Sequence, residues 1–520
     1  MPAPRRLLKR MIPLAALCAA AGSGCNLDWE KPDASLPPPE RFREATPKSA
    51  APIAGARDFA AKFGSPELTG FVEQALEQNL DIAAAMARIE EADAQARVAS
   101  AALWPSVTMN DLAQRTQVPG TRTSAVPNYN PAQAFFQAAG YRGTAGAVSN
   151  WTTFRATRTN LFALGLNASY EIDFWGKNED ASNAARILAN ASRFNRDVVE
   201  IATIAAVLNA YFQALAAQDQ LRIANENVDI ANRVFLAIKA RLEVGTATIL
   251  DYSQQEAVLA GQRATIPTLE QTLRQTKNTL AVLLGRTPES LEVKGGALTR
   301  LIYPKVAPGL PSEVLLRRPD VAEAEARLAS QEFSVLQARA AFFPSITLTG
   351  QYGVQSIVLS NLLRPEAIAW QIGSGIAQPF FDGYNLQGQY EFQKSRYKEL
   401  AALYRKQILT ALADAENALI AVRETARRVK LQADAVTASR RALEAAEARL
   451  REGTIDVVTL STTQTTLFQN ELNLTLARLA YFQSATSLYQ ALGGGWSPTT
   501  REAEIARASE AYEADKGPWP

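Results

Sequence analysis

The sequence predicts a mainly α-helical protein that also contributes β-strands to a membrane, with the second half of the chain repeating the first. Three observations support this fold class. Residues 177–244 and 389–452 contain neither Gly nor Pro, aligned motifs recur between the two halves, and four segments alternate apolar with polar residues. The first pattern is typical of long helices and the last of strands with one apolar face.

The N-terminus has the pattern of an export signal. Four basic side chains within residues 5–10 precede an apolar stretch at 11–21. This stretch is too short to span a bilayer but has the length of the apolar region of a signal peptide. The sequence therefore predicts a signal peptide over residues 1–24.

The residues at the end of this signal indicate lipidation. Gly-Ser-Gly-Cys at 22–25 resembles a bacterial lipoprotein cleavage box, in which Cys25 becomes the first mature residue and carries lipid. Gly22 stands where such boxes usually have Leu, so cleavage by an ordinary signal peptidase is the alternative. Asn26, rather than Asp, follows the Cys and favours sorting to the outer membrane. A proline-rich, extended arm is expected over 25–65.

An internal duplication organises the rest of the chain. ALWPSVT at 102–108 is echoed by AFFPSIT at 341–347, an offset of 239, and RLEVGT at 241–246 is echoed by RLREGT at 449–454, an offset of 208. The two offsets differ by 31 residues, which indicates an insertion in the first copy. The Gly-, Pro- and Asn-rich segment 119–150 fits an exposed loop of that length.

The repeat sets the predicted domain boundaries. We expect a first copy over 66–285 and a second over 312–493. A linker at 286–311 would join them, and a charged, Ala-rich tail would follow at 494–520. A period of about 200 residues is too long for a solenoid, so a domain-sized unit has been duplicated.

The two runs without Gly or Pro predict exceptionally long helices. Both are rich in Ala, Leu, Glu, Gln and Arg, and at about 1.5 Å per residue each would extend roughly 100 Å. Apolar residues recur in them every seven positions, which is the coiled-coil period. The two series are Val207, Ala214, Leu221, Val228, Phe235 and Leu242, and Ala415, Val422, Val429, Val436, Leu443 and Leu450.

Four alternating segments predict membrane strands at about 103–115, 160–175, 343–355 and 370–382. In the second, the apolar side chains at even positions from Phe162 to Phe174 oppose polar ones such as Asn167 and Glu171. Strands with one apolar face and aromatic ends are typical of membrane barrels. The alternative is a soluble sandwich. The smallest membrane barrel has about eight strands, so several chains would have to share one barrel.

Composition excludes many enzyme classes. The chain has no His, which removes imidazole-based catalysis, Ser-His-Asp sites and His-containing zinc sites. The net charge of +2 gives no reason to expect nucleic-acid binding, and without the four cations of the signal the balance is 50 basic against 52 acidic residues. The carboxylate pairs Glu323/Glu325 and Asp414/Glu416 are two apart on helices and do not share a face. We expect no enzyme activity, no cofactor and no metal.

Several motifs resemble the TolC-type outer-membrane factor family, in particular the lipoprotein branch that serves resistance-nodulation-division efflux pumps (NodT-like outer membrane efflux lipoproteins). They are spread over most of the mature chain. The matching segments are YEIDFWG at 170–176, LRRPDV at 316–321, AEARL at 324–328, AAFFPSI at 340–346 and ALGGGW at 491–496. Apart from the resemblance, Pro319 and Asp320 favour the start of a helix.

The resemblance implies a TolC-like homotrimer that passively conducts small molecules out of the cell. Three chains would share a twelve-stranded barrel in the outer membrane, anchored by lipid, and a helical coiled-coil tunnel in the periplasm. The partners would be a periplasmic adaptor (membrane fusion) protein and an inner-membrane resistance-nodulation-division pump. Two alternatives remain open: an outer-membrane conduit of a type I protein secretion system, and a non-conducting coiled-coil scaffold of the envelope.

The resemblance and the glycine positions also predict sites. The periplasmic tip turns should lie at Gly245-Thr246 and Gly453-Thr454, since Gly suits the left-handed turn at a helix end. The family's pore constriction, a Leu ring followed four residues later by an Asp ring, maps to Val458 and Thr462.

This chain departs from the family at the second ring. Because Thr462 is not acidic, Asp251 and Asp456 are the possible substitutes for a charged ring. The alternative for Thr462 is an ordinary polar helix residue. A ring of Val458 side chains would still gate by dewetting.

Overall fold

The structure is a computed structural model and describes residues 29, 31–43, 55–118, 157–304 and 310–496. The signal peptide, Cys25, the predicted loop at 119–150 and the tail beyond Trp496 lie outside these residues. The chain divides into two units. One, the helical unit, comprises residues 1–97, 181–335 and 389–520, and the other, the sheet unit, comprises 98–180 and 336–388. Each is described by itself.

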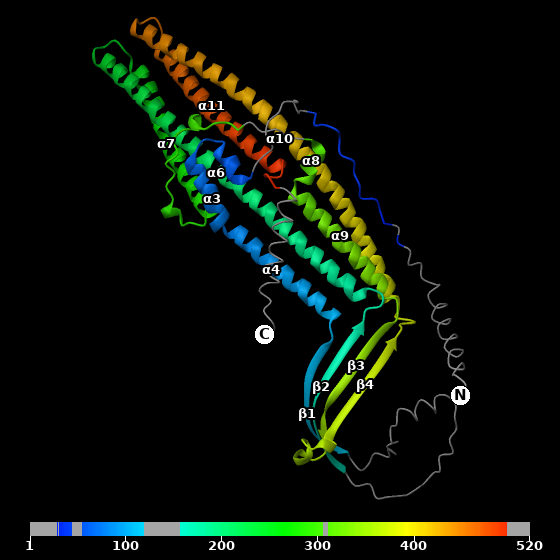
Figure 1. The fold of residues 1–520 in the computed structure, drawn as a ribbon. Helices are drawn as coiled ribbons and strands as arrows, with labels where there is room; N and C mark the ends of the chain where they lie inside the picture. Colours follow the sequence, from blue (N-terminus) through cyan, green and yellow to red (C-terminus); the bar gives the residue numbers. More distant parts are fainter. Residues whose placement is uncertain (1–28, 30, 44–54, 119–156, 305–309, 497–520) are drawn as a thin grey trace, which may run out of the picture. The chain divides into compact units, whose positions relative to one another are not determined.

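Helices make up most of the described chain (Figure 1). The α-helices are α2 (Ala56–Ala61), α3 (Pro66–Gln78), α4 (Leu80–Ser100), α6 (Lys177–Glu243), α7 (Ile249–Leu283), α8 (Pro311–Leu316), α9 (Pro319–Ala340), α10 (Asn385–Arg451) and α11 (Val457–Ala491). Short 3₁₀ helices are η2 (Ala101–Leu103), η3 (Pro288–Ser290), η4 (Leu298–Arg300), η5 (Leu359–Asn361) and η6 (Pro365–Ala367).

The long helices repeat between the two halves without any slip. Helices α6 and α10 have 67 residues each, α7 and α11 have 35 each, and the members of each pair start 208 residues apart. The two predicted long helices are confirmed. α10 starts four residues before its Gly-free run, so that Gly388 lies in its first turn, where a missing side chain costs little.

The seven-residue repeats form the seams of the helical unit. None of their members is exposed in the single chain. Leu443 and Leu450 of α10 pack with Leu460 and Leu467 of α11 and with Val234 of α6. A second cluster joins Ile223 and Ala224 of α6 to Phe468 of α11 and Ile266 of α7. The predicted coiled-coil packing is therefore confirmed.

The largest core lies where the N-terminal helices cover α6 and α11. Phe59 of α2 stacks on Tyr489 of α11 with ring centroids 4.4 Å apart, and Phe63 contacts Phe212 of α6 at 5.0 Å. Among the described helices, only α6 contains a stretch apolar enough to cross a membrane, and 56% of that stretch is buried in the protein. Its apolar character is explained by this core.

The segment before this core is partly as expected and partly not. Residues 31–43 are extended, and Leu36 and Phe42 pack beside α10. Residues 56–61, however, form helix α2 within the arm that the sequence predicts to be extended. Phe59 in α2 and Phe63 in the turn that follows explain the difference, because both rings are fully buried in the core.

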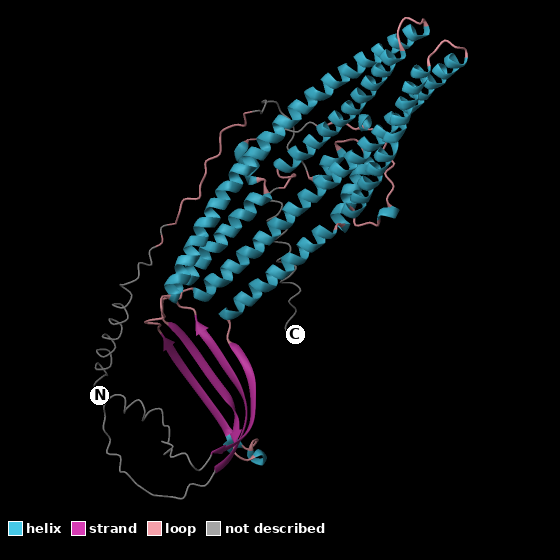
Figure 2. Ribbon diagram, turned by 180° about the vertical axis from the view of Figure 1, so that it is seen from behind, coloured by secondary structure: helices cyan, strands magenta, loops and turns pink. Residues whose placement is uncertain are grey.

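The sheet unit contains one antiparallel sheet in the order β1 (Ser106–Val118), β2 (Thr157–Ile172), β3 (Ser345–Ser356) and β4 (Ile368–Ala377) (Figure 2). Cross-strand pairs put side chains of one kind on one face. One row is Met109, Leu166, Tyr352 and Trp370, and the adjacent row on the other face is Thr108, Asn167, Gln351 and Gln371. The predicted alternation is confirmed in β2, β3 and β4 and at the start of β1, but after Asn110 the strand β1 places Asp111 and Arg115 on the apolar side and Leu112 on the polar side.

The strand ends differ from the sequence prediction by one to five residues. β1 and β3 start after Pro105 and Pro344, which have no N–H to donate to a ladder. β2 ends at Ile172, so the prediction that Phe174 and Trp175 belong to the strand is wrong. The Trp175 ring instead stacks on Phe343 at 4.7 Å, and its Nε1 donates to the Pro344 carbonyl oxygen at 2.9 Å. β4 likewise ends at Ala377, two residues before Pro379.

The corner before each long helix gives a first testable prediction. Gly176 precedes α6 with φ of 81°, and Tyr384, at the equivalent position before α10, has φ of 68°. A left-handed backbone is unfavourable for a side chain as bulky as Tyr, whereas Gly adopts it freely. We expect Tyr384→Gly to stabilise the protein by about 1 kcal/mol, measured as a higher urea midpoint of the purified protein. Gly176→Tyr, the reciprocal control, should lower that midpoint, and a fall in the Tyr384→Gly variant would contradict the argument.

The hairpin turns of the helical unit as a candidate functional site

The two long helical hairpins turn through the same backbone motif. Gly245 between α6 and α7 has φ of 77°, and Gly453 between α10 and α11 has φ of 73°. The Thr246 N–H donates to the Arg241 carbonyl oxygen at 2.8 Å, and the Thr454 N–H donates to that of Arg449 at 3.0 Å. These six-residue hydrogen bonds are the C-terminal cap that a left-handed Gly allows. The four predicted tip residues therefore form the two turns.

The turns lie together at one end of the helical unit (Figures 1 and 2). The Arg241 guanidinium Nη2 donates to the Leu450 carbonyl oxygen at 3.4 Å, which links one hairpin to the other. A Cβ atom at Gly245 or Gly453 would meet nothing within 4 Å. The outer surface of both turns is thus open.

The two turns differ in polarity. Around the first, Val244, Ile249 and Leu250 are 74%, 69% and 62% exposed. In the second turn the equivalent positions are the charged Glu452, the buried Val457 and the half-exposed Val458. We call Val244, Ile249 and Leu250 the apolar tip.

Asp251 and Asp456 cap the helices that leave the turns. The Asp251 carboxylate accepts from the Thr248 N–H at 2.9 Å within a capping box, and Asp456 accepts from the Thr459 N–H at 2.8 Å. Hydrogen bonds from the Thr248 backbone and hydroxyl lower the pKa of Asp251, while the neighbouring Asp456 opposes that effect. The bonds to Thr459 lower the pKa of Asp456. Their local role is capping, and both carboxylates are ionised at neutral pH.

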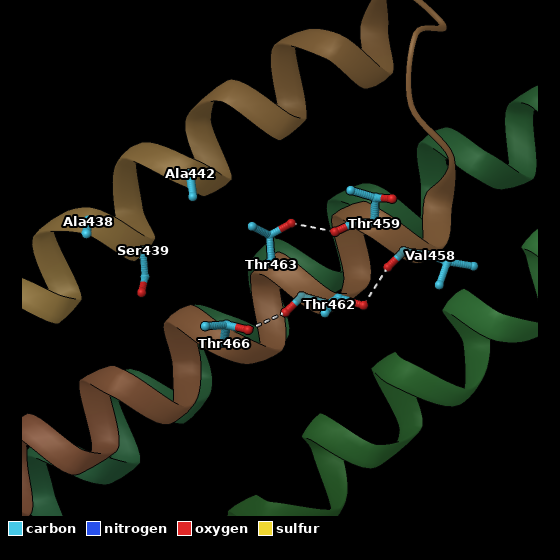
Figure 3. Close-up of a pocket in the computed structure, with 8 residues that line it drawn as sticks. All are labelled: Ala438, Ser439, Ala442, Val458, Thr459, Thr462, Thr463 and Thr466. Atoms are coloured by element: carbon cyan, nitrogen blue, oxygen red, sulfur yellow. Dashed lines mark hydrogen bonds between the residues drawn. The ribbon is translucent and has the colours of Figure 1, made fainter.

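Val458 and Thr462 lie on one exposed face of α11, in its first and second turns. Val458 is 49% exposed, and the Thr462 hydroxyl donates to its carbonyl oxygen at 2.9 Å. Both residues border two grooves. One, of about 570 Å³, runs between α10 and α11 (Figure 3), and the other, of about 660 Å³, runs between α7 and α11.

A buried glutamine fixes α11 against the first hairpin at this level. Gln255 of α7 is fully buried, its Nε2 donates to the Ala231 carbonyl oxygen of α6 at 3.3 Å, and its Oε1 accepts from the Ser461 hydroxyl of α11 at 3.0 Å. The exposed face with Val458 and Thr462 is therefore held in register with both helices of the first hairpin. The sequence alone did not single out Gln255, since an isolated Gln has no periodic signal.

A second polar centre, further along the helical unit, was also missed. The helix start predicted at Pro319-Asp320 is confirmed, but the preceding Arg318 is only 7% exposed. Its guanidinium donates to Asp320 at 2.9 and 2.5 Å, to Asp414 at 3.1 Å, and to the carbonyl oxygens of Ala411 and Ala491 at 3.4 Å each. It thus joins α9, α10 and the end of α11. The Asp414 side chain is 46% exposed and pairs with Arg318.

At the base of the sheet unit, acidic residues gather near the start of α6. The Asp173 carboxylate accepts from the Glu179 N–H at 2.6 Å. Burial raises the pKa of Asp180 to about 6, and repulsion from Glu179 and Asp173 adds to the shift. The group titrates near neutral pH, although no ligand-binding arrangement accompanies it.

Comparison with known proteins assigns the chain to a family. The sequence profile of outer membrane efflux proteins matches residues 71–286 and 310–494. The chain is 34% identical over 440 residues to the pyoverdine export outer membrane protein OpmQ of Pseudomonas aeruginosa, which covers 85% of this chain and 88% of OpmQ. It is 28% identical to the probable outer membrane lipoprotein SilC of Salmonella typhimurium, over 84% of this chain and 87% of SilC. The solved structure of the outer-membrane channel OprN superposes with a TM-score of 0.78 at 26% identity, covering 91% and 99% of the two chains.

Proposed function

The chain belongs to the outer membrane efflux protein family, and we propose that it forms the outer-membrane channel of a tripartite efflux pump as a homotrimer. Its location is the outer membrane and its activity is efflux. The assembly, its partners and the residues that carry conduction are the proposal. Solutes would pass through it without energy input from this chain, driven by an inner-membrane pump of the resistance-nodulation-division class.

The sheet is the observation that supports this proposal most directly. Its four described strands leave β1 and β4 with unpaired edges, and one face is mostly apolar, with Asp111 and Arg115 of β1 among the exceptions. An open edge and an apolar face are stable in a bilayer only when other strands close the barrel, and four strands are too few to close. Joining β4 of one chain to β1 of the next in a trimer satisfies both requirements, with the polar face toward the pore.

The hairpin turns are the proposed docking surface for the periplasmic adaptor. Gly245, Thr246, Gly453 and Thr454 form two open turns at the same end of the helical unit. Turns with no side chain against them leave room for a partner. The lipid anchor is proposed at Cys25, which lies outside the described residues, and it would hold the N-terminal arm at the membrane.

The constriction is proposed at Val458, the exposed apolar residue nearest the second turn on α11. Three copies at one level would form a narrow apolar ring that opposes hydration of the pore. Asp251 and Asp456, the ionised helix caps beside the turns, would contribute negative charge just beyond this ring.

Single-channel recording from purified trimer in planar bilayers tests the proposal. We expect wild-type protein to conduct and Val458→Ala to raise the conductance or the open fraction by about 2-fold or more, because a smaller side chain widens and wets the ring. Leu236→Ala, which shortens an exposed apolar side chain on α6, is the matched control and should leave both unchanged. A silent trimer would refute the channel, whereas unchanged Val458→Ala currents would refute only the constriction.

The choice between efflux and protein secretion depends on the partner. Cells that express this chain with a proton-driven pump and its adaptor should lower the intracellular level of small fluorescent dyes. Restoration of protein export with an ABC exporter, and not of dye efflux, would favour the secretion conduit instead.

A further inference from the structure

The exposed face of α11 that carries Val458 and Thr462 has no charged side chain. Two grooves flank this face, one against α10 and one against α7. Their linings together are Gln254, Ala257, Val258, Ala438, Ser439, Ala442, Val458, Thr459, Ser461, Thr462, Thr463, Thr465, Thr466, Gln469 and Asn470. In a chain that is 20% charged, three charged residues would be expected in a surface of this size. We call these residues the neutral wall.

The charge that this part of α11 does carry is directed elsewhere. Between the Asp456 cap and Arg478, only Glu471 is ionisable. Its side chain is 13% exposed, and its carboxylate accepts from the Arg440 guanidinium of α10 at 2.6 Å. Glu471 is therefore neutralised by Arg440 and does not add an unpaired charge to the neutral wall.

The hydroxyl groups of the wall present acceptors and methyl groups to the outside. Thr462 and Thr466 donate to the carbonyl oxygens four residues earlier at 2.9 and 2.8 Å (Figure 3). Thr465 does so at 2.9 Å. Because each hydroxyl hydrogen is used within the helix, the surface offers oxygen lone pairs and γ-methyl groups. Such a surface is uncharged and moderately apolar.

We propose that the neutral wall lines the narrow part of the channel and lets solutes pass without selection by the sign of their charge. The proposal rests on the channel function above. It assigns to the channel a substrate class defined by charge, which includes anions and zwitterions as well as cations.

The physical basis is that pores select ions through fixed charges at narrow points. A ring of carboxylates favours cations, and a ring of Lys or Arg favours anions. In a wide tunnel, charges are screened within about 10 Å at 0.1 M salt, so they select weakly. A narrow stretch lined by Thr, Ser, Gln and Ala offers neither sign a counter-charge. The fixed charges next to the wall are the helix caps Asp251 and Asp456 and the Arg440–Glu471 ion pair beside Ser439 and Asn470, and the test below separates their effect from that of the wall.

The test is the reversal potential of the trimer in a planar bilayer across a KCl gradient of about 10-fold. Wild type should show potassium-to-chloride permeability within about 3-fold of unity. Thr462→Asp should raise that ratio by about 5-fold or more, and Thr466→Lys should lower it by a similar factor. Thr437→Asp is the matched control: Thr437 is an exposed α10 residue with the same hydroxyl-to-carbonyl hydrogen bond, next to Ala438 but outside the wall. It should leave the ratio unchanged.

Each outcome decides the matter. A strongly cation-selective wild type, or equal shifts from Thr462→Asp and Thr437→Asp, would overturn the neutral wall while leaving the channel in place. If Thr462→Asp did not assemble, Thr466→Lys alone would carry the test. Absence of any wild-type conductance would overturn the channel function itself, and the inference with it.

Discussion

An Arg318→Met protein is expected to lose about 1–3 kcal/mol of folding free energy and to yield less assembled channel. The guanidinium is buried, and its removal leaves the Asp320 and Asp414 carboxylates without their cation. It also removes a donor from the carbonyl oxygen of Ala491 at the end of α11 and from that of Ala411, which keeps its hydrogen bond within α10. The Asp320 side chain is 23% exposed and that of Asp414 is 46% exposed, so water replaces only part of what the guanidinium supplies. The urea midpoint of the purified protein and the fraction of trimer that resists dissociation in detergent measure the loss.

The neighbouring arginine provides the control. Arg317 is exposed, and its guanidinium is 3.8 Å from the Glu313 carboxylate, so Arg317→Met should change the stability by less than about 1 kcal/mol. Adding Asp414→Asn to Arg318→Met should recover part of the loss, because one uncompensated charge is removed. Equal losses from Arg317→Met and Arg318→Met would show that the buried network does not stabilise the fold.

Charging the apolar tip is expected to abolish export while leaving the channel intact. Val244→Glu with Leu250→Glu converts two exposed apolar side chains of the first turn into carboxylates. An adaptor that covers this turn would then have to bury charge, which is costly without a partner. Efflux of a fluorescent dye by cells carrying the whole pump should fall at least about 10-fold, equivalent to about 1.4 kcal/mol in adaptor affinity.

Two measurements separate docking from folding in this variant. Its trimer yield and single-channel conductance should match wild type, since both side chains already face solvent. Val282→Glu, an equally exposed apolar residue at the other end of α7, should retain efflux. Loss of conductance together with efflux would mean that the apolar tip serves assembly rather than docking.

Periodicity and glycine placement were enough to predict most of the architecture. The seven-residue repeats are half-buried or buried throughout, and the alternation in the strands agrees with the observed cross-strand pairs. Gly245 and Gly453 mark their turns because no other residue adopts that backbone so readily. The placement of Val458 and Thr462 came from family resemblance, and their pore role remains a prediction.

What the sequence did not predict depends on contacts between distant segments. Arg318 and Asp414 are 96 residues apart, and Gln255 reaches Ser461 across 206 residues. A polar residue in a helix has no local signal that distinguishes a buried partner from solvent. The helix α2 was missed for the same reason, since Phe59 and Phe63 are ordered by α6 and α11 rather than by their own neighbours. Tyr384 has the same left-handed backbone as its counterpart Gly176. Nothing in the sequence around Tyr384 indicates that backbone, because Tyr rarely adopts it.

The equal lengths of the paired helices restrict how the length of the periplasmic tunnel can change during evolution. Both hairpins are built from one helix of 67 residues and one of 35, and their turns lie at the same end. Removing one heptad from α6 alone would shift its turn by about 10 Å relative to that of α10 and leave one heptad of the partner helices without a facing seam at that end. A shorter or longer tunnel therefore requires matched deletions or insertions in four helices, each a whole number of heptads. Related channels should accordingly differ in tunnel length in discrete steps, with paired gaps 208 residues apart in this numbering.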